Sequence, residues 1–568
     1  MAKETRMFRT GLLVLTKPLA VIQNGIPSVL EKASERVQNT LYIHLVPRDP
    51  KKLPNLQTSL LVNPFITVPA NPSIRNVIIE LYRTSARVCR HLDVRVLLSH
   101  MTGSYRRNSD QLSRQRYSFR SKFEVVLIDE CCDNESVILQ ELSKTFTFDN
   151  GAGILTIHSD SKHESETKSD SESETLTSEQ SMMVNGADTC LEAYQHGVMG
   201  GTFDRLHVGH KILLSDACLR CSESVTVGVT DGQMNKKKTL CELILPIETR
   251  INDVKTFMQE VKPRLRYTVV PINDPFGPST QDPQLQCIVV SQETLRGGHK
   301  VNEERAKKGL NHLDIHVIDL IEDLHHSPEE EVKISSSSAR KRLLGTLIKD
   351  PEFQSKPGIC LKPYRIGLTG GIASGKSSVC KRLQKLGAAI IDCDKLGHQV
   401  YRKGTECFQR LVSEFGTEIV GEDGEVHRRA LGAIVFSDKN KLSKLNEIVW
   451  PEIANLAEGE IRDYASAGRS VVVLDAAVLL EAGWDNMVHE VWAVVVPTTE
   501  AVKRLQDRNS LSEEEALKRI SSQMTSEERV ERSNVILSTL WEYEVTQKQV
   551  EKAWKLLNER INVDKAQL

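Results

Sequence analysis

The sequence lacks any unbroken apolar run of about 18 residues, the length that a membrane-spanning helix needs. It has only 12 cysteines in 568 residues, too few for a disulfide scaffold, which favours a reducing compartment. Neither charge is in excess, because 74 basic and 76 acidic side chains leave a net charge of −2. A dedicated nucleic-acid binder would show a strongly basic domain, so nucleic acid is not an expected partner.

The length predicts several domains, because one domain takes roughly 150 residues. Residues 159–181 contain eight serines, seven acids and a single aliphatic residue, so they cannot bury enough apolar surface to offset the entropy lost on folding. We therefore predict a disordered linker at 159–187 between an N-terminal region, 1–158, and a middle domain, 188–357. A proline-containing stretch with little periodicity then precedes a last domain, 358–568.

The N-terminal region alternates short apolar runs with helical stretches, which predicts an α/β fold. The runs are Leu12–Leu15, Leu41–Leu45, Val94–Leu98 and Val125–Ile128. The region holds no catalytic constellation, so the sequence leaves its function open. Residues 8–22 are mostly apolar and follow Lys3 and Arg6, which fits an organelle-targeting or membrane-surface segment as well as a first strand. Lys17-Pro18 interrupts the stretch and favours the strand, and cytoplasm and mitochondrion are both expected locations.

The last domain alternates strands and helices, as doubly wound parallel sheets do, and contains a complete P-loop, Gly370-x-x-x-x-Gly375-Lys376-Ser377. A predicted strand, Tyr364–Leu368, precedes the motif and a predicted helix, Ser377–Leu386, follows it, as the motif requires. Backbone N–H groups and the helix dipole bind phosphate there, and Lys376 reaches the outer phosphates of a nucleoside triphosphate. The residues expected to bind the nucleotide are Gly370, Gly371, Ala373, Ser374, Gly375, Ser377 and Ser378.

Acidic residues follow two further strands of this domain. Asp475 ends the apolar strand Val471–Asp475 and is expected, with the Ser377 hydroxyl, to hold Mg²⁺. Asp392 and Asp394 close another strand at the edge where such sheets bind ligands, so one of them is expected to accept a hydroxyl proton or to hold the metal. A helix cap is the alternative for these acids.

Two predicted helices near the C-terminus surround a polar turn and carry Arg504, Arg508 and Arg519. Arg504 and Arg508 are four residues apart and share one helix face. Arginines on such a hairpin suit a lid that closes over phosphates and stabilises the transferred charge, a role we assign first to Arg508. A solvated charged face is the alternative.

The P-loop, the Asp392-x-Asp394 pair, the VVLDAAVLLEAGW stretch and the RLQDRN…RISSQ helices together resemble the dephospho-coenzyme A kinases. The resemblance covers roughly residues 362–562 and implies phosphorylation of the ribose 3′-hydroxyl of dephospho-coenzyme A by ATP. It implies that Asp394 orients or deprotonates this hydroxyl, with Asp392 beside it. The chain departs from the bacterial pattern at Trp450-Pro451, where that pattern has His-Pro, and after Asp475, where it lacks Pro-Leu-Leu, and both departures concern acceptor binding.

The middle domain shows the same alternation, with strands expected at His196–Gly200, Ser224–Thr230, Tyr267–Pro271, Cys287–Val290 and His316–Leu320. The first of them leads into a Gly201-Thr202-Phe203 turn and then into His207-x-Gly209-His210 at the start of a helix. Histidines at a helix N-terminus can donate ring N–H bonds to phosphate oxygens. A zinc site is the alternative for the pair, but no further ligands at suitable spacing accompany it.

Three downstream segments add candidate phosphate ligands. They contain Lys236, Lys237 and Lys238, among which the sequence does not choose, then Arg296 and Gly297, and finally Lys333 with the serine run Ser335, Ser336 and Ser337. Serines before a helix offer hydroxyl and N–H donors, although a flexible serine linker is the alternative. Together with Gly201 and Phe203, these residues form the expected nucleotide site of the middle domain.

The GTFD segment, the HxGH pair and the serine run together resemble the HxGH nucleotidyltransferases, most closely the eukaryotic-type phosphopantetheine adenylyltransferases, over roughly residues 192–350. The resemblance implies attack of 4′-phosphopantetheine on the α-phosphate of ATP, which gives dephospho-coenzyme A and pyrophosphate. His207 and His210 then stabilise developing negative charge and Thr202 aligns the phosphates, with no covalent enzyme intermediate.

The product of the middle domain is the substrate of the last, and the two resemblances in this order are those of the bifunctional coenzyme A synthases. The predicted fold is α/β throughout: an HxGH nucleotidyltransferase Rossmann-like domain followed by a P-loop kinase domain. The expected substrates are ATP, 4′-phosphopantetheine and dephospho-coenzyme A, with Mg²⁺ as the cofactor. Two alternatives stay open, a kinase joined to a nucleotidyltransferase for another phosphorylated acceptor and a nucleotide-binding scaffold without turnover.

Overall fold

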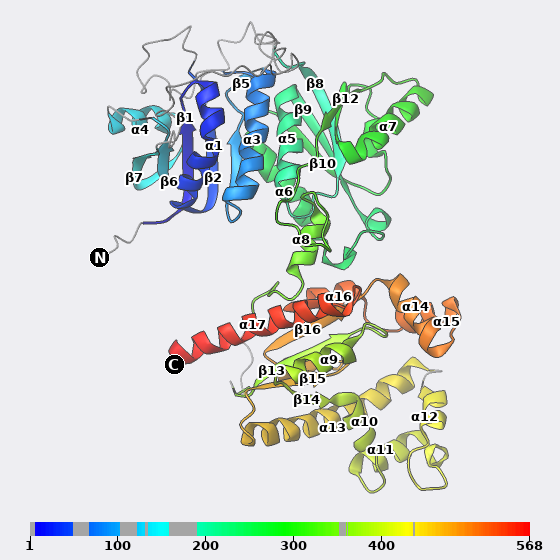
Figure 1. The fold of residues 1–568 in the computed structure, drawn as a ribbon. Coiled ribbons are helices and arrows are strands. Elements are labelled where there is room, and N and C mark those ends of the chain that lie inside the picture. Colours follow the sequence, from blue (N-terminus) through cyan, green and yellow to red (C-terminus); the bar gives the residue numbers. More distant parts are fainter. Residues whose placement is uncertain are drawn as a thin grey trace, which may run out of the picture. The chain divides into compact units, whose positions relative to one another are not determined.

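The computed structural model describes residues 6–48, 68–102, 122–130, 134–157, 190–351, 359–360, 362–435 and 438–567. The predicted linker at 159–187 lies outside these residues. The chain divides into two compact units (Figure 1). The first holds Met1–Lys238 and Leu245–Ser338, and the second holds Thr239–Ile244 and Ala339–Leu568.

The first sheet of the first unit is built by the N-terminal region. Its strands are β1 (Phe8–Leu15), β2 (Val37–Leu45), β4 (Asp93–Leu97), β6 (Phe123–Ile128) and β7 (Phe148–Thr156). All neighbours are parallel, in the order β4-β2-β1-β6-β7, with helices α1 (Leu19–Ser34), α3 (Pro72–Val88) and α4 (Glu135–Ser143) between them. The four predicted apolar runs are confirmed as strands, and residues 8–15 form the first strand.

The second sheet of this unit belongs to the middle domain. Its strands are β8 (Tyr194–Gly201), β9 (Cys221–Thr230), β10 (Arg266–Ile272), β11 (Cys287–Ser291) and β12 (Asp314–Ile318), in the order β10-β9-β8-β11-β12. The connecting helices are α5 (Val208–Arg220), α6 (Ile247–Val261) and α7 (Leu295–Lys307), and α8 (Ser336–Leu343) follows the sheet. All five predicted strands are present, the last shifted by two residues. The short strands β3 (Val68–Pro69) and β5 (Met101–Thr102) pair with each other outside these sheets. Counted along the chain without them, both sheets have the strand order third, second, first, fourth, fifth.

The second unit contains one five-stranded parallel sheet, ordered β14-β15-β13-β16-β17. Its strands are β13 (Tyr364–Gly370), β14 (Ala389–Asp392), β15 (Val471–Asp475), β16 (Glu490–Val495) and β17 (Val535–Ser538). Helix α9 (Lys376–Lys385) follows the P-loop, α10 (Cys393–Gln399) follows β14, and α17 (Tyr543–Gln567) ends the chain. The two helices predicted around the polar turn are α14 (Thr498–Asn509) and α15 (Glu513–Ser521).

The remaining helices of this unit are α11 (Glu406–Phe415), α12 (Arg428–Val435), α13 (Lys439–Ser466) and α16 (Ser526–Glu531). Every residue of β13, the central strand, is buried, as expected for a parallel sheet covered by helices on both faces. The carboxyl ends of β8 and β13 carry the HxGH segment and the P-loop. Ligands of such sheets bind at this edge, so the fold places both motifs where phosphate chemistry is expected.

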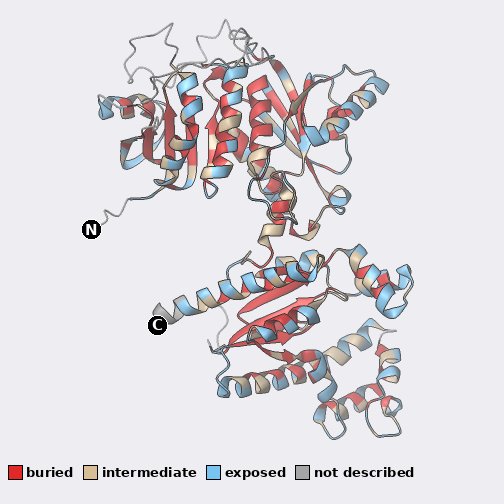
Figure 2. Cartoon of the chain, viewed as in Figure 1, coloured by how far each residue is buried: buried red, intermediate tan, exposed pale blue. Residues whose placement is uncertain are grey.

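The two sheets of the first unit share one hydrophobic core. Helix α3 of the N-terminal region packs against both α1 and α5, and buried residues of both sheets belong to the same cluster. Figure 2 shows this continuous buried interior in red. Two backbone hydrogen bonds also join the N-terminal region to the middle domain, from Leu98 N–H to the Val261 carbonyl at 2.9 Å and from Leu191 N–H to the Ala70 carbonyl at 2.8 Å. The N-terminal region is therefore packed as part of the same folded unit as the middle domain.

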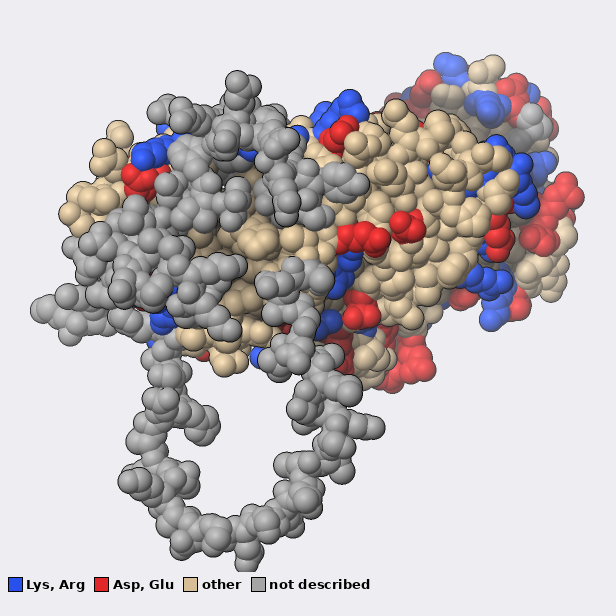
Figure 3. Space-filling model, turned by 90° about the horizontal axis from the view of Figure 1, so that it is seen from above, with Lys and Arg blue, Asp and Glu red and all other residues tan. Residues whose placement is uncertain are grey.

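The described surface in Figure 3 mixes basic and acidic residues among many uncharged ones. Within the described part of that face no broad basic area is visible, which agrees with the net charge of −2. Among the described residues, no helix combines the length and the apolar character needed to cross a membrane.

Gly197 of β8 lets two cysteines from neighbouring strands meet over the centre of the sheet. A Cβ at this position would lie 2.5 Å from Cys221 Sγ and 3.1 Å from Cys287 Sγ. We expect Gly197→Ala to lower the free energy of unfolding by about 1–3 kcal/mol, the usual cost of overpacking a core. Urea unfolding of the full chain measures this loss.

The matched control is Gly153→Ala in β7, where an added Cβ meets no atom within 4 Å. It should change the free energy of unfolding by no more than about 0.5 kcal/mol. Equal effects of the two substitutions would contradict the packing argument.

Candidate active sites

The HxGH histidines line a cavity of about 480 Å³ at the carboxyl end of β8. His207 is the N-cap residue of α5, and its ring stacks on that of His210 with the centroids 3.8 Å apart. The predicted residues Gly201, Thr202 and Phe203 line the same cavity. A second wall is apolar, with Ile272, Pro275, Phe276 and Val290, so the cavity joins polar and apolar surfaces.

Both histidines are half-buried, and desolvation of their rings is the main reason why their pKa values are low. The pKa of His207 falls to about 4, and that of His210 falls well below its ordinary value, where the neighbouring His207 adds to the effect of burial. Both rings are therefore neutral at pH 7. The Nδ1 atom of each is buried without a hydrogen-bond partner. A neutral imidazole still carries one N–H donor, so the pair can bind a phosphate oxygen without a charge of its own.

Lys238 is the lysine of the three-residue run that reaches this cavity. It lines the cavity and donates a hydrogen bond to Thr202 Oγ1, which also accepts one from Thr230 Oγ1 at 3.2 Å. Lys236 and Lys237 are exposed and are not among the lining residues. The structure therefore separates three lysines that the sequence could not tell apart.

The downstream segments reach the cavity in part. Gly297, Lys333, Ser335 and Ser336 line it, whereas Arg296 is exposed and neither Arg296 nor Ser337 is among the lining residues. Ser336 Oγ donates to the Asp204 carbonyl at 3.0 Å, and Ser335 Oγ accepts from Ser338 N–H at 3.1 Å. The serine run therefore starts α8 beside the GTFD loop and does not behave as a linker.

Arg250 of α6 supports the GTFD loop and was missed by the sequence analysis. It is only 1% exposed and donates to the carbonyls of Thr202 at 2.9 Å, Thr230 at 2.8 Å and Leu245 at 2.8 Å. One guanidinium thus joins the ends of two strands to the start of a helix. No motif marks it, because a single arginine in an amphipathic helix usually faces solvent.

The P-loop connects β13 to α9 with the geometry that its glycines allow. Gly375 has φ +85°, and a Cβ there would lie 2.6 Å from Thr539 Oγ1. At Gly370 a Cβ would meet Ser374 Oγ at 2.6 Å. Ile372 N–H donates to Gln523 Oε1 at 2.7 Å, so the segment after α15 also contacts the loop. Larger residues at these glycines would displace the loop from its supports.

Lys376 lies between two of the predicted acids. It donates a hydrogen bond to Asp475, and its Nζ is 3.9 Å from Asp394 Oδ2. Partial desolvation raises the pKa of Asp394 although its side chain is 64% exposed; Lys376 opposes this shift, and Asp475 and Asp392 add to it. Asp392 instead uses its side chain as the N-cap of α10 and accepts Lys395 N–H at 3.0 Å. The Asp392 carboxylate thus acts as a helix cap, the alternative that the sequence left open, while Asp394 faces the P-loop lysine.

Of the three predicted arginines, Arg504 is the one seen on the P-loop. It donates to the Ala373 carbonyl at 3.1 Å and to the Thr539 carbonyl at 2.6 Å. Arg508 is exposed and donates to Asn509 Oδ1 at 2.9 Å, and Arg519 is exposed on α15. In this structure Arg504 is therefore the arginine that contacts the P-loop, and the role assigned to Arg508 stays a prediction.

Arg529 is a second buried arginine without a sequence signal. It donates to Thr369 Oγ1 at 2.8 Å, to the Ala477 carbonyl at 3.1 Å and to Glu481 Oε1 at 2.7 Å. It thereby links the strand before the P-loop to the segment after Asp475, where the chain departs from the bacterial pattern. Within the described residues, no three His, Cys, Asp or Glu side chains gather as a metal site.

Three known families match successive parts of the chain. The COASY N-terminal domain matches residues 9–137, the cytidylyltransferase-like family matches 198–342, and the dephospho-CoA kinase family matches 364–540. The order of these families along the chain is the order of the three sheets.

Individual relatives match the last domain. A dephospho-CoA kinase from Carboxydothermus hydrogenoformans is 43% identical over 185 residues, 33% of this chain and 90% of the relative. One from Geobacter sulfurreducens is 40% identical over 189 residues, 33% of this chain and 96% of the relative. Among solved structures, a dephospho-CoA kinase from Campylobacter jejuni is 23% identical with a TM-score of 0.28, covering 35% of this chain and 98% of that one.

The low pKa of His207 makes the stability of the first unit depend on pH. In the unfolded chain this histidine takes up a proton below about pH 6.5, whereas in the folded chain it does so only near pH 4. Between these values the unfolded state binds more protons, so stability is lost as the pH falls. We expect His207→Gln to remove about 2 kcal/mol of the loss between pH 7 and pH 5, measured by urea unfolding.

His299→Gln, on the exposed side of α7, is the control and should leave the pH dependence unchanged. A pH dependence that is the same in the parent and in His207→Gln would show that the buried ring is not the source.

Proposed function

The chain belongs to the dephospho-CoA kinase family and has the three-domain architecture of a bifunctional coenzyme A synthase, and we propose that it performs the last two steps of coenzyme A synthesis. The observation that carries the proposal is the pair of phosphate-binding loops at the carboxyl ends of the central strands of two sheets, β8 and β13. The first reaction makes dephospho-coenzyme A, and the second phosphorylates it.

In the first step the phosphate of 4′-phosphopantetheine attacks the α-phosphorus of ATP and pyrophosphate leaves. The groups suited to the developing charge are the neutral rings of His207 and His210, the Lys238 ammonium and the free N–H groups at the start of α5. Arg250 holds the Thr202 carbonyl, and so the loop, in place. Catalysis then consists of positioning and charge stabilisation, with no group on the enzyme modified.

In the second step the ribose 3′-hydroxyl attacks the γ-phosphorus of ATP and ADP leaves. Asp394 is suited to accept the hydroxyl proton, because its carboxylate is open to a ligand and lies 3.9 Å from the lysine that binds phosphate. Arg504 already contacts the P-loop, so its guanidinium is placed to stabilise negative charge on the transferred phosphoryl group.

Mg²⁺ bound with ATP would be held by the Ser377 hydroxyl and the Asp475 carboxylate. Both are hard oxygen donors, and Mg²⁺ usually takes few protein ligands beside phosphate oxygens. The donors fit, because Ser377 is exposed at the start of α9 and Asp475 already contacts Lys376 at the same edge of the sheet. The ion supplies neutralisation of the phosphate charge.

Product analysis tests the assignment of the two steps. Mass spectrometry of the purified chain with 4′-phosphopantetheine and Mg-ATP should show coenzyme A. Lys376→Ala should accumulate dephospho-coenzyme A. His207→Ala should form dephospho-coenzyme A on the order of 10²–10³-fold more slowly than the parent. It should still phosphorylate added dephospho-coenzyme A.

The alternatives give different outcomes in the same assay. A transferase for another phosphorylated acceptor would release no pyrophosphate with 4′-phosphopantetheine. A nucleotide-binding scaffold would bind ATP and turn over neither substrate. Either result from folded protein would overturn the proposal.

The lysine run offers a matched pair of variants. Lys238→Ala should lower the rate of adenylyl transfer on the order of 10²-fold, because it removes a cation from the cavity. Lys237→Ala, one residue away and exposed, should leave the rate within about twofold, since exposed side chains away from a site contribute little. Pyrophosphate release measures both rates, and equal rates in the two variants would remove Lys238 from the site.

A further inference from the structure

Helix α5, which carries the HxGH histidines, is buried on all sides. Every residue from Lys211 to Arg220 is buried, and Figure 2 shows the helix largely in red. One face packs on β8, β9 and β11 of its own sheet, and the opposite face packs on α3 of the N-terminal region. A helix at the surface of a doubly wound domain would keep one polar face in water. In this protein the N-terminal region covers the face of α5 that would otherwise contact water.

The polar residues on the covered face each find a partner in the N-terminal region. Asp216 forms an ion pair with Arg75 of α3, and Ser215 Oγ is 3.3 Å from Tyr82 Oη. Lys211 forms an ion pair with Asp93 and donates to the Val94 carbonyl at 3.1 Å. The face of α5 that packs on the N-terminal region therefore has charged partners there as well as packing contacts.

The direction of the strands brings Asp93 close to the catalytic edge. Helix α6 runs opposite to the strands of its own sheet, as crossover helices do. Strand β4 runs alongside α6 in the same direction, because Leu98, just after β4, bonds to Val261 at the end of α6. The two sheets thus run in opposite directions. The amino end of β4, which Asp93 opens, lies beside the first turn of α5.

The first turn of α5 has few other side-chain supports. His207 is the N-cap residue but makes no side-chain capping bond, and Lys211 N–H donates to the His207 carbonyl at 3.0 Å. The Lys211 side chain is 9% exposed, so its charge needs a fixed partner. Asp93 provides that partner and is itself held by Arg95 at 2.6 Å. The turn that carries His207 and His210 is thereby anchored to another sheet.

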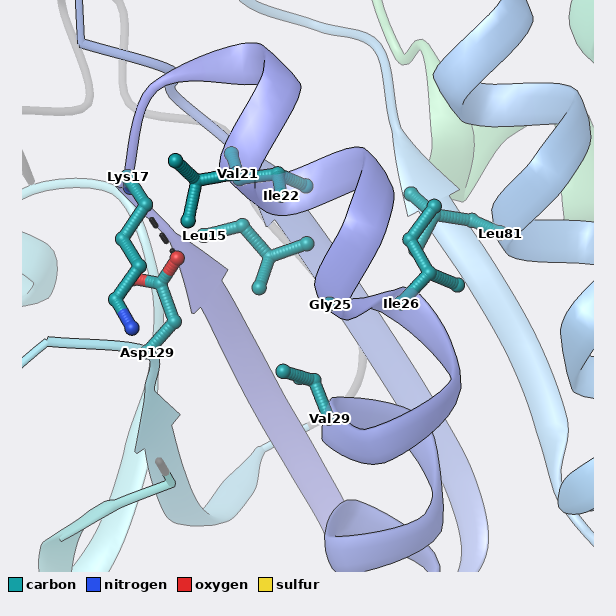
Figure 4. A pocket seen from close by; sticks show the side chains of 9 residues that line it. All are labelled: Leu15, Lys17, Val21, Ile22, Gly25, Ile26, Val29, Leu81 and Asp129. Carbon is teal, nitrogen blue, oxygen red and sulfur yellow. Dashed lines mark hydrogen bonds between the residues drawn. The ribbon is translucent and has the colours of Figure 1, made fainter. Parts of the chain in front are cut away.

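The N-terminal sheet does not repeat the chemistry of the sheet it supports. Its β1–α1 connection is only Thr16-Lys17-Pro18, and Asp129 accepts the N–H groups of Thr16 at 2.8 Å and Lys17 at 3.2 Å. Figure 4 shows apolar side chains of β1 and α1 below this turn, where the cavity measures only about 10 Å³. That volume is too small for a nucleotide, so the described residues around this connection leave no room for a second nucleotide.

We propose that Lys211 is a positioning residue for adenylyl transfer and that Asp93 of the N-terminal region holds it in place. The N-terminal region is then an integral part of the adenylyltransferase. The inference rests on the proposed function, because it needs His207 and His210 to act on phosphate.

Lys211→Met in the full chain tests the proposal, because methionine keeps most of the apolar stem and leaves Asp93 paired with Arg95. The kcat of dephospho-coenzyme A formation should fall about tenfold to hundredfold, as a small misplacement of reacting groups does. The KM for ATP should stay within about twofold, since the phosphate ligands remain. The kinase rate with added dephospho-coenzyme A should not change and reports the amount of active second unit, while urea unfolding of the same sample reports the folding of the first unit.

Arg75→Met is the matched control, since it removes a cation from the same interface far from the histidines. It should lower thermal stability and leave kcat unchanged. Asp93→Asn should reproduce the loss in kcat, and Asp93→Glu should restore most of it. This second pair decides the question if Lys211→Met fails to fold.

An unchanged kcat in Lys211→Met or Asp93→Asn would overturn the proposal, as would an equal loss in Arg75→Met, which would indicate general destabilisation. A parent chain that forms no dephospho-coenzyme A would instead refute the proposed function. The two failures are therefore distinguishable.

Discussion

Both active sites depend on one constraint, the need to present free backbone N–H groups where a buried central strand gives way to a helix. The segment between β8 and α5 and the one between β13 and α9 each meet it. Because the donors belong to the backbone, the side chains around them are free to set the chemistry. Neutral histidines serve one site, and a lysine with nearby carboxylates serves the other.

Loops that expose N–H groups to a ligand also leave carbonyl oxygens that need partners, and three arginines provide them. Arg250 bonds to carbonyls around the GTFD loop, Arg504 to those around the P-loop, and Arg529 to Ala477 and Glu481. A guanidinium suits this role because it donates in several directions from one rigid plane. The precision of each site therefore comes from helices remote in the sequence.

The N-terminal sheet shares its strand order with the neighbouring sheet but not the loop that follows the first strand. It has the same order as the catalytic sheet beside it, yet the connection after its first strand is short and its cavity is filled. What it contributes is burial and charge partners for α5. Within the described residues, the phosphate-binding motifs thus lie in the loops of the other two sheets, and the N-terminal sheet contributes contacts to α5.

By itself the sequence determined the α/β class, the position of most strands and both phosphate-binding motifs, because apolar runs and glycine spacing are local properties of the chain. It could not choose among Lys236, Lys237 and Lys238, and it could not show that Arg504 contacts the P-loop. It gave no sign of Arg250, Arg529 or the Lys211–Asp93 pair. Those contacts join residues up to 160 positions apart. Only the packing of helices on sheets brings such residues together, so only the tertiary structure could decide them.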